Sequence, residues 1–266
     1  MRVLITGASD GIGKETARQL SRQGHSIVMI GRDNKKSRSA RAEIQAGAEG
    51  EVDLLTADLS DMKSVVILAE QIMNKFSDVK ILINNAAIIR TEHILTSDNF
   101  EETFAVNYLS HFLLTRKLLD VLKQNAPSRI INVSSMVHES GSIDFDDLQS
   151  SRSYNPSRAY AQSKVAMVLF TQELHKRYFK DGISANALHP GVINTKLLHV
   201  LFSGGSAVEQ GAETPVYLAT SKEVEGISGK YFVNKQEAYS RFLEEGESQA
   251  RRLWEISEEL LSQYIS

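Results

Sequence analysis

The sequence contains no cysteine, and only four of its 266 residues are proline. Without cysteine the chain has no disulfide, no thiolate nucleophile and no zinc-thiolate site, which fits a reducing compartment. Four prolines leave little material for a Pro-rich linker, and no Ser/Gly tract or charge block divides the chain. Because 42% of the residues are apolar, roughly three quarters of the unfolded surface can be buried. We therefore expect a single domain over residues 1–266.

Long apolar runs and an excess of charge of one sign are also missing. No stretch of about 20 apolar residues could span a membrane, and "MRVLITGAS" enters a strand-like run without the features of a signal peptide. The net charge of -3, with scattered signs, gives no broad basic surface for nucleic acid. His111, His138, His189 and His199 have no ligand-like spacing with acidic residues, so we predict no metal. These absences predict a cytoplasmic protein with no membrane span and no nucleic-acid partner.

Seven short apolar runs recur between helical patterns. They are Arg2–Thr6, Ser26–Ile30, Val52–Thr56, Ile81–Asn84, Arg129–Ser134, Ser184–Leu188 and Lys230–Val233. Runs that barely alternate are typical of strands buried on both faces of a parallel sheet. Helical patterns lie at 12–23, 61–76, 97–124, 158–180 and 209–220. This alternation predicts an α/β fold with a doubly wound parallel sheet, helices on both faces, and a ligand crevice at the carboxyl ends of the strands. Residues 239–266 are predicted to form one or two charged amphipathic helices packed on the outside.

A glycine-rich turn, "TGASDGIGKE", follows the first predicted strand and opens the first helix. Glycine allows positive φ and close backbone approach, and the amides of a helix's first turn attract a pyrophosphate. The spacing is a variant of the dinucleotide-binding turn. A tight strand-to-helix turn with no ligand is the alternative. The candidate pyrophosphate-binding residues are Gly7, Ser9, Asp10, Gly11, Ile12 and Gly13.

The second predicted strand ends in "MIGRD", close to where an adenosine ribose would lie. Arg32, with Lys35, Lys36 and Arg38 nearby, favours the 2′-phosphate of NADP, because a guanidinium binds a phosphate with a fork of donors. If Asp33 faced the ribose, NAD would be preferred instead. These cations are also compatible with a solvated loop. Further candidates at the ends of the third and fourth strands are Asp58, Leu59, Asn85, Ala86 and Ala87.

"YAQSK" places Tyr160 and Lys164 on one face of a predicted helix. A phenol with a pKa of about 10 needs a decrease of about three units, or roughly 4 kcal/mol, to accept a proton near neutrality. A neighbouring ammonium and an oxidised nicotinamide would favour that decrease. Alone, the pair is also compatible with a solvated helix face.

Asn107 interrupts an apolar helix and could mark a kinked turn, a bound water or a partly exposed amide. Ser134 and Ser135 close the fifth strand.

Several motifs together resemble the short-chain dehydrogenases/reductases, from residue 3 to about 233. They are "TGASDGIG", "NNAA", Asn107, "NVSS", "YAQSK" and "HPGVINT", in that order. The resemblance implies a Rossmann-type seven-stranded sheet and a catalytic tetrad of Asn107, Ser135, Tyr160 and Lys164. The family's catalytic serine corresponds to the second residue of the pair Ser134 and Ser135. It also implies that Tyr160 is the general acid or base, that Lys164 binds the nicotinamide ribose, and that Asn107 holds a water linking Lys164 to solvent. The segment implied to position the nicotinamide contains Pro190, Gly191, Val192 and Thr195.

Two features indicate a branch within this family. Tyr160 follows Ser135 by 25 positions, which is a long interval for the family. This interval and the motif "LFTQEL" are similar to those of the retinol-dehydrogenase-like enzymes. That branch includes enzymes that act on lipophilic carbonyls. Membrane-bound members carry an apolar anchor before the glycine turn, and we see none here. Ala87 replaces a common glycine. We expect a substrate loop at about 136–159, a substrate segment at about 194–209, and pairing into a homodimer or homotetramer through the two long helices, which the tail could block or complete.

The sequence therefore predicts an oxidoreductase that transfers a hydride between NADP(H) and a lipophilic carbonyl or alcohol, with NAD(H) as the alternative cofactor. The competing hypothesis is a dinucleotide-binding sensor or scaffold without catalysis. Proteins of that kind usually lack the tyrosine or the lysine of the tetrad, whereas this chain has Tyr160 and Lys164.

Overall fold

The computed structural model describes residues 1–201 and 203–265, in which one sheet runs in the order β3-β2-β1-β4-β5-β6-β7-β8. Seven strands are parallel, as predicted. They are β1 (Arg2–Thr6), β2 (Ser26–Gly31), β3 (Val52–Thr56), β4 (Val79–Asn84), β5 (Ser128–Val133), β6 (Ile183–His189) and β7 (Lys230–Val233). The eighth, β8 (Gln236–Ala238), was not predicted and pairs antiparallel with β7. Two polar residues and an alanine carry no apolar pattern, so this edge strand has no signal in the sequence.

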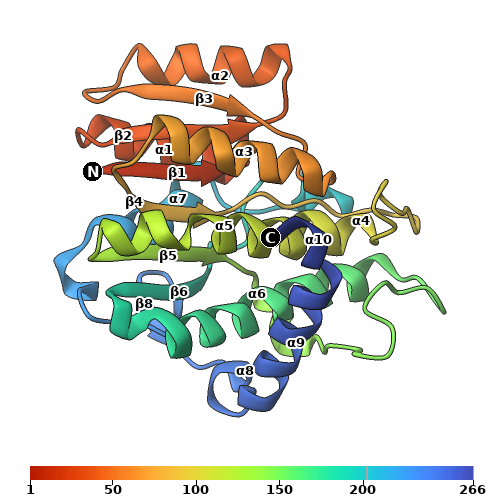
Figure 1. Cartoon of the computed structure of the whole chain (residues 1–266). Helices are drawn as coiled ribbons and strands as arrows, with labels where there is room; N and C mark the ends of the chain where they lie inside the picture. The colour runs from red at the N-terminus through yellow and green to blue at the C-terminus, as the bar shows by residue number, and fades with distance from the viewer. Residues whose placement is uncertain (202, 266) are drawn as a thin grey trace.

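Helices cover both faces of the sheet (Figure 1). Helices α1 (Gly11–Arg22), α2 (Lys35–Gln45) and α7 (Val208–Thr220) lie on one face, and α3 (Met62–Lys75), α5 (Ser110–Gln124) and α6 (Pro156–Tyr178) lie on the other. Successive residues of β1 point to opposite faces: Val3 and Ile5 join the core under α1 and α7, whereas Leu4 joins the core under α5 and α6. Burial on both faces explains why the strands read as continuous apolar runs.

Helix α2 differs from the sequence prediction, which places no helix after the second strand. Asn34 caps it, because its side-chain oxygen accepts a hydrogen bond from the Ser37 amide at 2.9 Å. Ala40 and Ile44 face the core, while the cations Lys35 and Lys36 are exposed. The many charged and small residues of this segment conceal its narrow apolar stripe.

The predicted helix 97–124 is also more irregular than expected. It begins as the short α4 (Glu102–Phe104), continues as a π-helical turn at Ala105–Leu109 and becomes α5 only at Ser110. Short 3-10 turns occupy Met136–Ser140, Phe179–Asp181, Leu198–Val200 and Lys222–Val224. The π turn lies at Asn107, where the sequence indicates a kinked turn.

The tail forms α8 (Arg241–Glu244), α9 (Glu247–Leu260) and α10 (Ser262–Ile265), which run across α6 toward α5 (Figure 1). The sequence predicts that the tail packs on the outside, but part of it is buried in the core. Trp254 is 1% exposed, and its ring lies 4.9 Å from that of Phe112 on α5 and 6.0 Å from that of Phe170 on α6. One buried indole therefore makes the tail part of the core on this face of the sheet.

Two further findings concern the described residues only. None of their helices is both long and apolar enough to cross a membrane. Within residues 1–201 and 203–265, no three His, Asp or Glu side chains form a group that could hold a metal ion.

Candidate active site

The glycine turn between β1 and α1 requires its glycines for two reasons. Gly7 and Gly11 have φ of 68° and 51°, which favour glycine. A Cβ on Gly13 would lie 2.4 Å from Asn85 Nδ2 and 2.5 Å from Gly7 O, so no side chain fits there. The side chain of Asp10, the N-cap of α1, makes no capping hydrogen bond. This helix start fits a pyrophosphate.

Charge and packing around the turn also suit an anion. Lys36 pairs with Asp10, and Lys196 Nζ lies 3.7 Å from the same carboxylate. Burial acts to raise the pKa of Asp10, but the hydrogen bond and charge of Lys36 lower it overall. A Cβ on Gly11 would lie 3.3 Å from Thr195 Cγ2, so the segment after β6 closes over the glycine turn. Two lysines thus stand at the start of α1, beyond the carboxyl end of β1.

A hollow of about 400 Å3 lies beside the ends of β2 and β3. Its lining residues are Arg32, Asp33, Thr56, Ala57, Asp58 and Ser64. The Asp33 carboxylate pairs with Arg38, whereas Arg32 has no ion pair among the residues that the structure describes. The Asp58 carboxylate accepts hydrogen bonds from the Ser60 amide and hydroxyl, at 2.9 and 2.7 Å. The structure therefore brings Arg32, Asp33 and Asp58 to one cavity, while Leu59 is buried and does not line it.

Tyr160 and Lys164 are buried together on α6, with 8% and 2% of their surfaces exposed. Lys164 Nζ lies 5.5 Å from the centre of the Tyr160 ring and donates to Val133 O at 3.0 Å. The Ser135 hydroxyl hydrogen-bonds the Tyr160 side chain, while Ser134 Oγ is occupied by Lys164 O at 2.8 Å. A solvated helix face is therefore excluded, and of the two serines it is Ser135 that reaches the phenol.

Burial sets the protonation of this pair. It raises the pKa of Tyr160 to about 12, against the lowering effect of the Ser135 hydrogen bond. It lowers the pKa of Lys164 to about 7. In the protein alone, desolvation is the largest effect on the pKa of Tyr160, and a lowering of this pKa with an oxidised nicotinamide bound stays a prediction. At pH 7 the phenol is therefore a proton donor.

Asn107 lies in the π turn and is 0% exposed, so the alternative of a partly exposed amide is wrong. Its Oδ1 accepts from the Ile88 amide at 2.7 Å. Its Nδ2 donates to Ile88 O and to Ser163 Oγ, both at 3.0 Å. The side chain thus ties the loop after β4 to the helix that carries Tyr160 and leaves the main-chain carbonyl for other partners.

The remaining predicted residues also lie at the carboxyl ends of the strands. Thr6 Oγ1 accepts hydrogen bonds from the amides of Asn85 and Ala86, at 2.8 and 3.0 Å. Thr195 Oγ1 accepts from the Leu198 amide at 3.3 Å and so begins a 3-10 turn. The others, which lie in the glycine turn, after β4 or after β6, are Ser9, Ile12, Ala87, Pro190, Gly191 and Val192.

Sequence reasoning missed Thr6 and His111, since a threonine ending a strand and a histidine within an apolar helix have no distinctive spacing.

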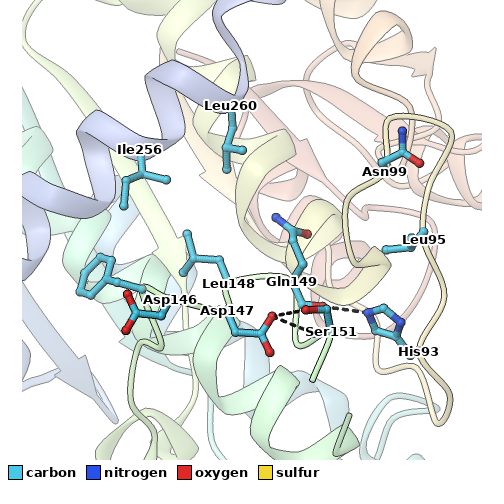
Figure 2. A pocket seen from close by; sticks show the side chains of 11 residues that line it. His93, Leu95, Asn99, Asp146, Asp147, Leu148, Gln149, Ser151, Ile256 and Leu260 are labelled. Carbon is cyan, nitrogen blue, oxygen red and sulfur yellow. Dashed lines mark hydrogen bonds between the residues drawn. The ribbon is translucent and has the colours of Figure 1, made fainter. Parts of the chain in front are cut away.

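A second hollow, of about 450 Å3, lies between the predicted substrate loop, the segment 93–99 and α9 (Figure 2). Its lining residues are His93, Leu95, Asn99, Phe145, Asp146, Asp147, Leu148, Gln149, Ser151, Ile256 and Leu260. None of them belongs to the Tyr160 cluster. The loop is anchored there, because the His93 ring hydrogen-bonds Gln149 O at 2.8 Å and Gln162 Nε2 donates to Leu148 O at 3.0 Å. The loop ends before Pro156, where α6 begins, earlier than the predicted boundary.

Comparison with known proteins identifies the family. The short chain dehydrogenase profile matches residues 1–204. The chain belongs to the short-chain dehydrogenase family. The dehydrogenase is 43% identical to retinol dehydrogenase 13 of Homo sapiens and 40% identical to human retinol dehydrogenase 14, over 97% and 96% of this chain and 84% of each relative. The predicted family and its retinol-dehydrogenase-like branch are confirmed, and with them an oxidoreductase.

Solved structures agree with this assignment. A structure from Mycobacterium Paratuberculosis has a TM-score of 0.79 and 32% identity, covering 97% of the dehydrogenase and 92% of that chain. A structure from Beutenbergia cavernae that contains bound NADP has a TM-score of 0.73 and 24% identity, covering 88% and 94%. The second likeness concerns the fold alone. Together they confirm the Rossmann-type architecture.

We expect Lys164→Met to stabilise the dehydrogenase at pH 6.5 by about 2 kcal/mol, since it removes a buried amine whose pKa is lowered to about 7. Between about pH 7 and 10.5 the unfolded wild type binds a proton that the folded state lacks, so wild-type stability rises with pH there and the difference shrinks. Urea unfolding at pH 6.5 and 9.5 measures it. The exposed-site control Lys35→Met should show no such pH dependence. A loss of stability in Lys164→Met at pH 6.5 would contradict the expectation.

Proposed function

We propose that the dehydrogenase reduces lipophilic aldehydes or ketones with NADPH and oxidises the corresponding alcohols with NADP. The observation that carries this proposal is the cluster of buried Tyr160 and Lys164 with half-buried Ser135 at the carboxyl end of β5. The pyrophosphate would lie at the start of α1 and the nicotinamide ribose at Lys164. The cofactor supplies the hydride, and the chain supplies orientation and proton transfer.

In carbonyl reduction, the Tyr160 hydroxyl donates its proton to the substrate oxygen, acting as the general acid. Its raised pKa keeps this proton in place across the neutral range. The Ser135 hydroxyl donates a hydrogen bond to the same oxygen as negative charge develops there. Lys164, whose pKa is about 7, can return a proton to the phenolate at neutral pH. The family resemblance implies that Asn107 would hold a water through which Lys164 recovers that proton from solvent, and we assign this role to its main-chain carbonyl because its carboxamide is engaged by Ile88 and Ser163. Alcohol oxidation reverses these roles.

The adenosine end of the site supports NADP over NAD. Asp33 could bind ribose hydroxyls, but its carboxylate is already paired with Arg38. Arg32 lines the same hollow with no ion pair among the described residues, so its guanidinium is available for a 2′-phosphate. NAD(H) remains the alternative if Asp33 exchanges Arg38 for the ribose.

A lipophilic substrate is supported by exposed apolar side chains in the segments that follow β5 and β6. Met136, next to Ser135, is 52% exposed, and Val192 and Val200 are 47% and 40% exposed. Val200 lies in the predicted substrate segment 194–209 together with Leu197, Leu198 and Leu201, and Phe202 of that segment lies outside the described residues. The relatives are named retinol dehydrogenases, so retinal belongs in a test panel with other long-chain aldehydes. A cytoplasmic location stays a prediction.

The competing function, a sensor or scaffold without catalysis, needs only the cofactor turn. Such a protein would gain nothing from a buried phenol and amine, because burying Lys164 costs stability. The complete Tyr160 cluster therefore favours catalysis.

We expect Tyr160→Phe to reduce kcat/KM for NADPH-dependent aldehyde reduction by about 10³-fold, since it removes the general acid. Wild-type reduction should be nearly flat from pH 6 to 9, because Tyr160 stays protonated below its pKa of about 12. Alcohol oxidation should rise with pH over that range as the phenol becomes easier to deprotonate. Absorbance of NADPH at steady state measures both. Tyr239→Phe, at an exposed site, is the control. Equal rates in Tyr160→Phe and the wild type would defeat catalysis by this phenol.

We expect Arg32→Ser to raise the KM for NADPH about tenfold or more while changing the KM for NADH less than threefold, because only NADPH carries the phosphate that the guanidinium binds. Initial rates with the two cofactors measure this. Lys35→Ala removes an exposed cation outside the lining of the hollow and should have little effect. A parallel loss with both cofactors in Arg32→Ser would argue against NADP preference.

Assembly through α5 and α6, as the family resemblance implies, would meet the tail. We propose that α9 takes the place of a partner helix there, because Trp254 already packs on Phe112 and Phe170. Light scattering should give the molar mass of one chain for the wild type. Trp254→Ala, which opens this face, should increase self-association or expose apolar surface. A wild-type dimer that Trp254→Ala leaves intact would show that pairing uses another surface.

A further inference from the structure

His111 connects two parts of the site that sequence reasoning treats separately. It is 0% exposed and lies in α5, just after the π turn. Its Nδ1 is 3.0 Å from the main-chain oxygen of Asn107, and its Nε2 is 2.9 Å from Thr6 Oγ1 at the end of β1. One imidazole therefore joins the π turn to the strand that opens the glycine turn.

The hydrogen-bond partners determine the state of this imidazole. A carbonyl only accepts, so Nδ1 must carry a hydrogen and donate it to Asn107 O. Burial lowers the pKa of His111 to about 4, the Asn107 bond acts to raise it, and the charge of Lys164 acts to lower it. The ring is therefore neutral at pH 7, and Nε2 is an acceptor for the Thr6 hydroxyl. The other contact open to that hydroxyl, Ile83 O, is longer at 3.4 Å.

The chain of bonds continues to the loop after β4. Thr6 Oγ1, while donating to His111, accepts from the amides of Asn85 and Ala86. Every group has a compatible donor or acceptor role, so the network has one direction from the loop amides to the Asn107 carbonyl. The loop that flanks the glycine turn and the carbonyl in the π turn are thereby held in one frame.

We propose that His111 is a positioning residue that orients the main-chain carbonyl of Asn107 for the proton route between Lys164 and solvent. The inference rests on the proposed function. A π turn departs from the regular hydrogen-bond ladder, so a carbonyl within it benefits from a side-chain donor that fixes its direction. A carbonyl oxygen has two lone pairs, so the bond from His111 does not by itself prevent the oxygen from accepting a second donor. A neutral ring near the charge of Lys164 holds the carbonyl without carrying the proton itself.

Two substitutions separate the two ends of the imidazole. In His111→Asn, the side-chain Nδ2 takes the place of the ring Nδ1 and retains the donor to Asn107 O. In His111→Gln, the side-chain terminus takes the place of Nε2 and retains the contact with Thr6 but not the donor to Asn107. A role in proton transfer therefore predicts that His111→Gln is the more damaging change, whereas a purely structural role through Thr6 predicts the reverse.

We expect His111→Gln to lower kcat for aldehyde reduction about tenfold and to raise the solvent deuterium isotope effect on kcat from about 1 to about 2 or more, because proton recovery becomes rate-limiting. The KM for NADPH should change less than twofold. His111→Asn should keep kcat within about threefold of the wild type, with an unchanged isotope effect. Steady-state rates of the full chain with NADPH in H2O and D2O measure these quantities. An unchanged isotope effect in His111→Gln, or the opposite order of the two variants, would overturn the proposal.

Thr115→Val is the matched control. Thr115 lies four residues further along α5, is 0% exposed, and accepts from Asn84 Nδ2 at 3.1 Å. The variant removes a buried polar contact from the same helix without touching Asn107. It should lower stability in urea to a similar extent and leave the isotope effect unchanged. An isotope effect that rises equally in Thr115→Val would attribute the result to general loosening of α5 and overturn the proposal.

Nitrogen NMR of the full chain tests the geometry independently of activity. His111 should remain neutral and protonated at Nδ1 from pH 5.5 to 8. A charged ring or a proton on Nε2 at pH 7 would overturn the inference. An active wild type that depends on Tyr160, together with a normal His111→Gln variant, would reject the role of His111 alone. An inactive wild type would instead contradict the proposed function.

Discussion

The burial of the Lys164 amine beside the Tyr160 phenol is the constraint on which the rest of the site depends. Desolvation moves both pKa values toward the neutral forms, raising that of Tyr160 to about 12 and lowering that of Lys164 to about 7. The cost of this burial has to be met by the surrounding core, which is why the pair lies on a 23-residue helix packed between the sheet and the tail. The same desolvation strengthens any interaction made with a developing charge.

Hydrogen bonds between side chains and the main chain connect the elements around these two groups. Asn107 uses its carboxamide to join the loop after β4 to α6, and its carbonyl is bound by His111. Thr6 then connects His111 to the amides of the same loop. The irregular π turn is thus held by hydrogen bonds to the Asn107 carboxamide and to its main-chain oxygen. Local sequence rules fail at this turn because the partners are distant in the chain.

Much of the fold could be predicted because each parallel strand is a continuous apolar run and the glycine turn marks the first βα junction. Helix α2 escaped prediction because its apolar stripe is narrow, and β8 because two polar residues and an alanine give no pattern. The motifs indicated Tyr160 and Lys164, but their pKa values depend on three-dimensional burial. His111 could not be assigned from the sequence, since a buried histidine in an apolar helix has meaning only when Thr6 and the Asn107 carbonyl are seen at its two nitrogens.

The tail contributes to the same frame from the opposite side. Trp254 packs against Phe112, the residue after His111, and against Phe170 on the helix that carries Tyr160. The guanidinium groups of Arg116 and Arg177 lie over its ring, at 5.4 and 4.5 Å, so that α5, α6 and α9 all contact one indole. Since a packed core transmits displacement rather than absorbing it, the spacing of α5 and α6 depends on α9. The tail therefore supports the packing of α5 against α6, the helices that carry His111 and the Tyr160–Lys164 pair.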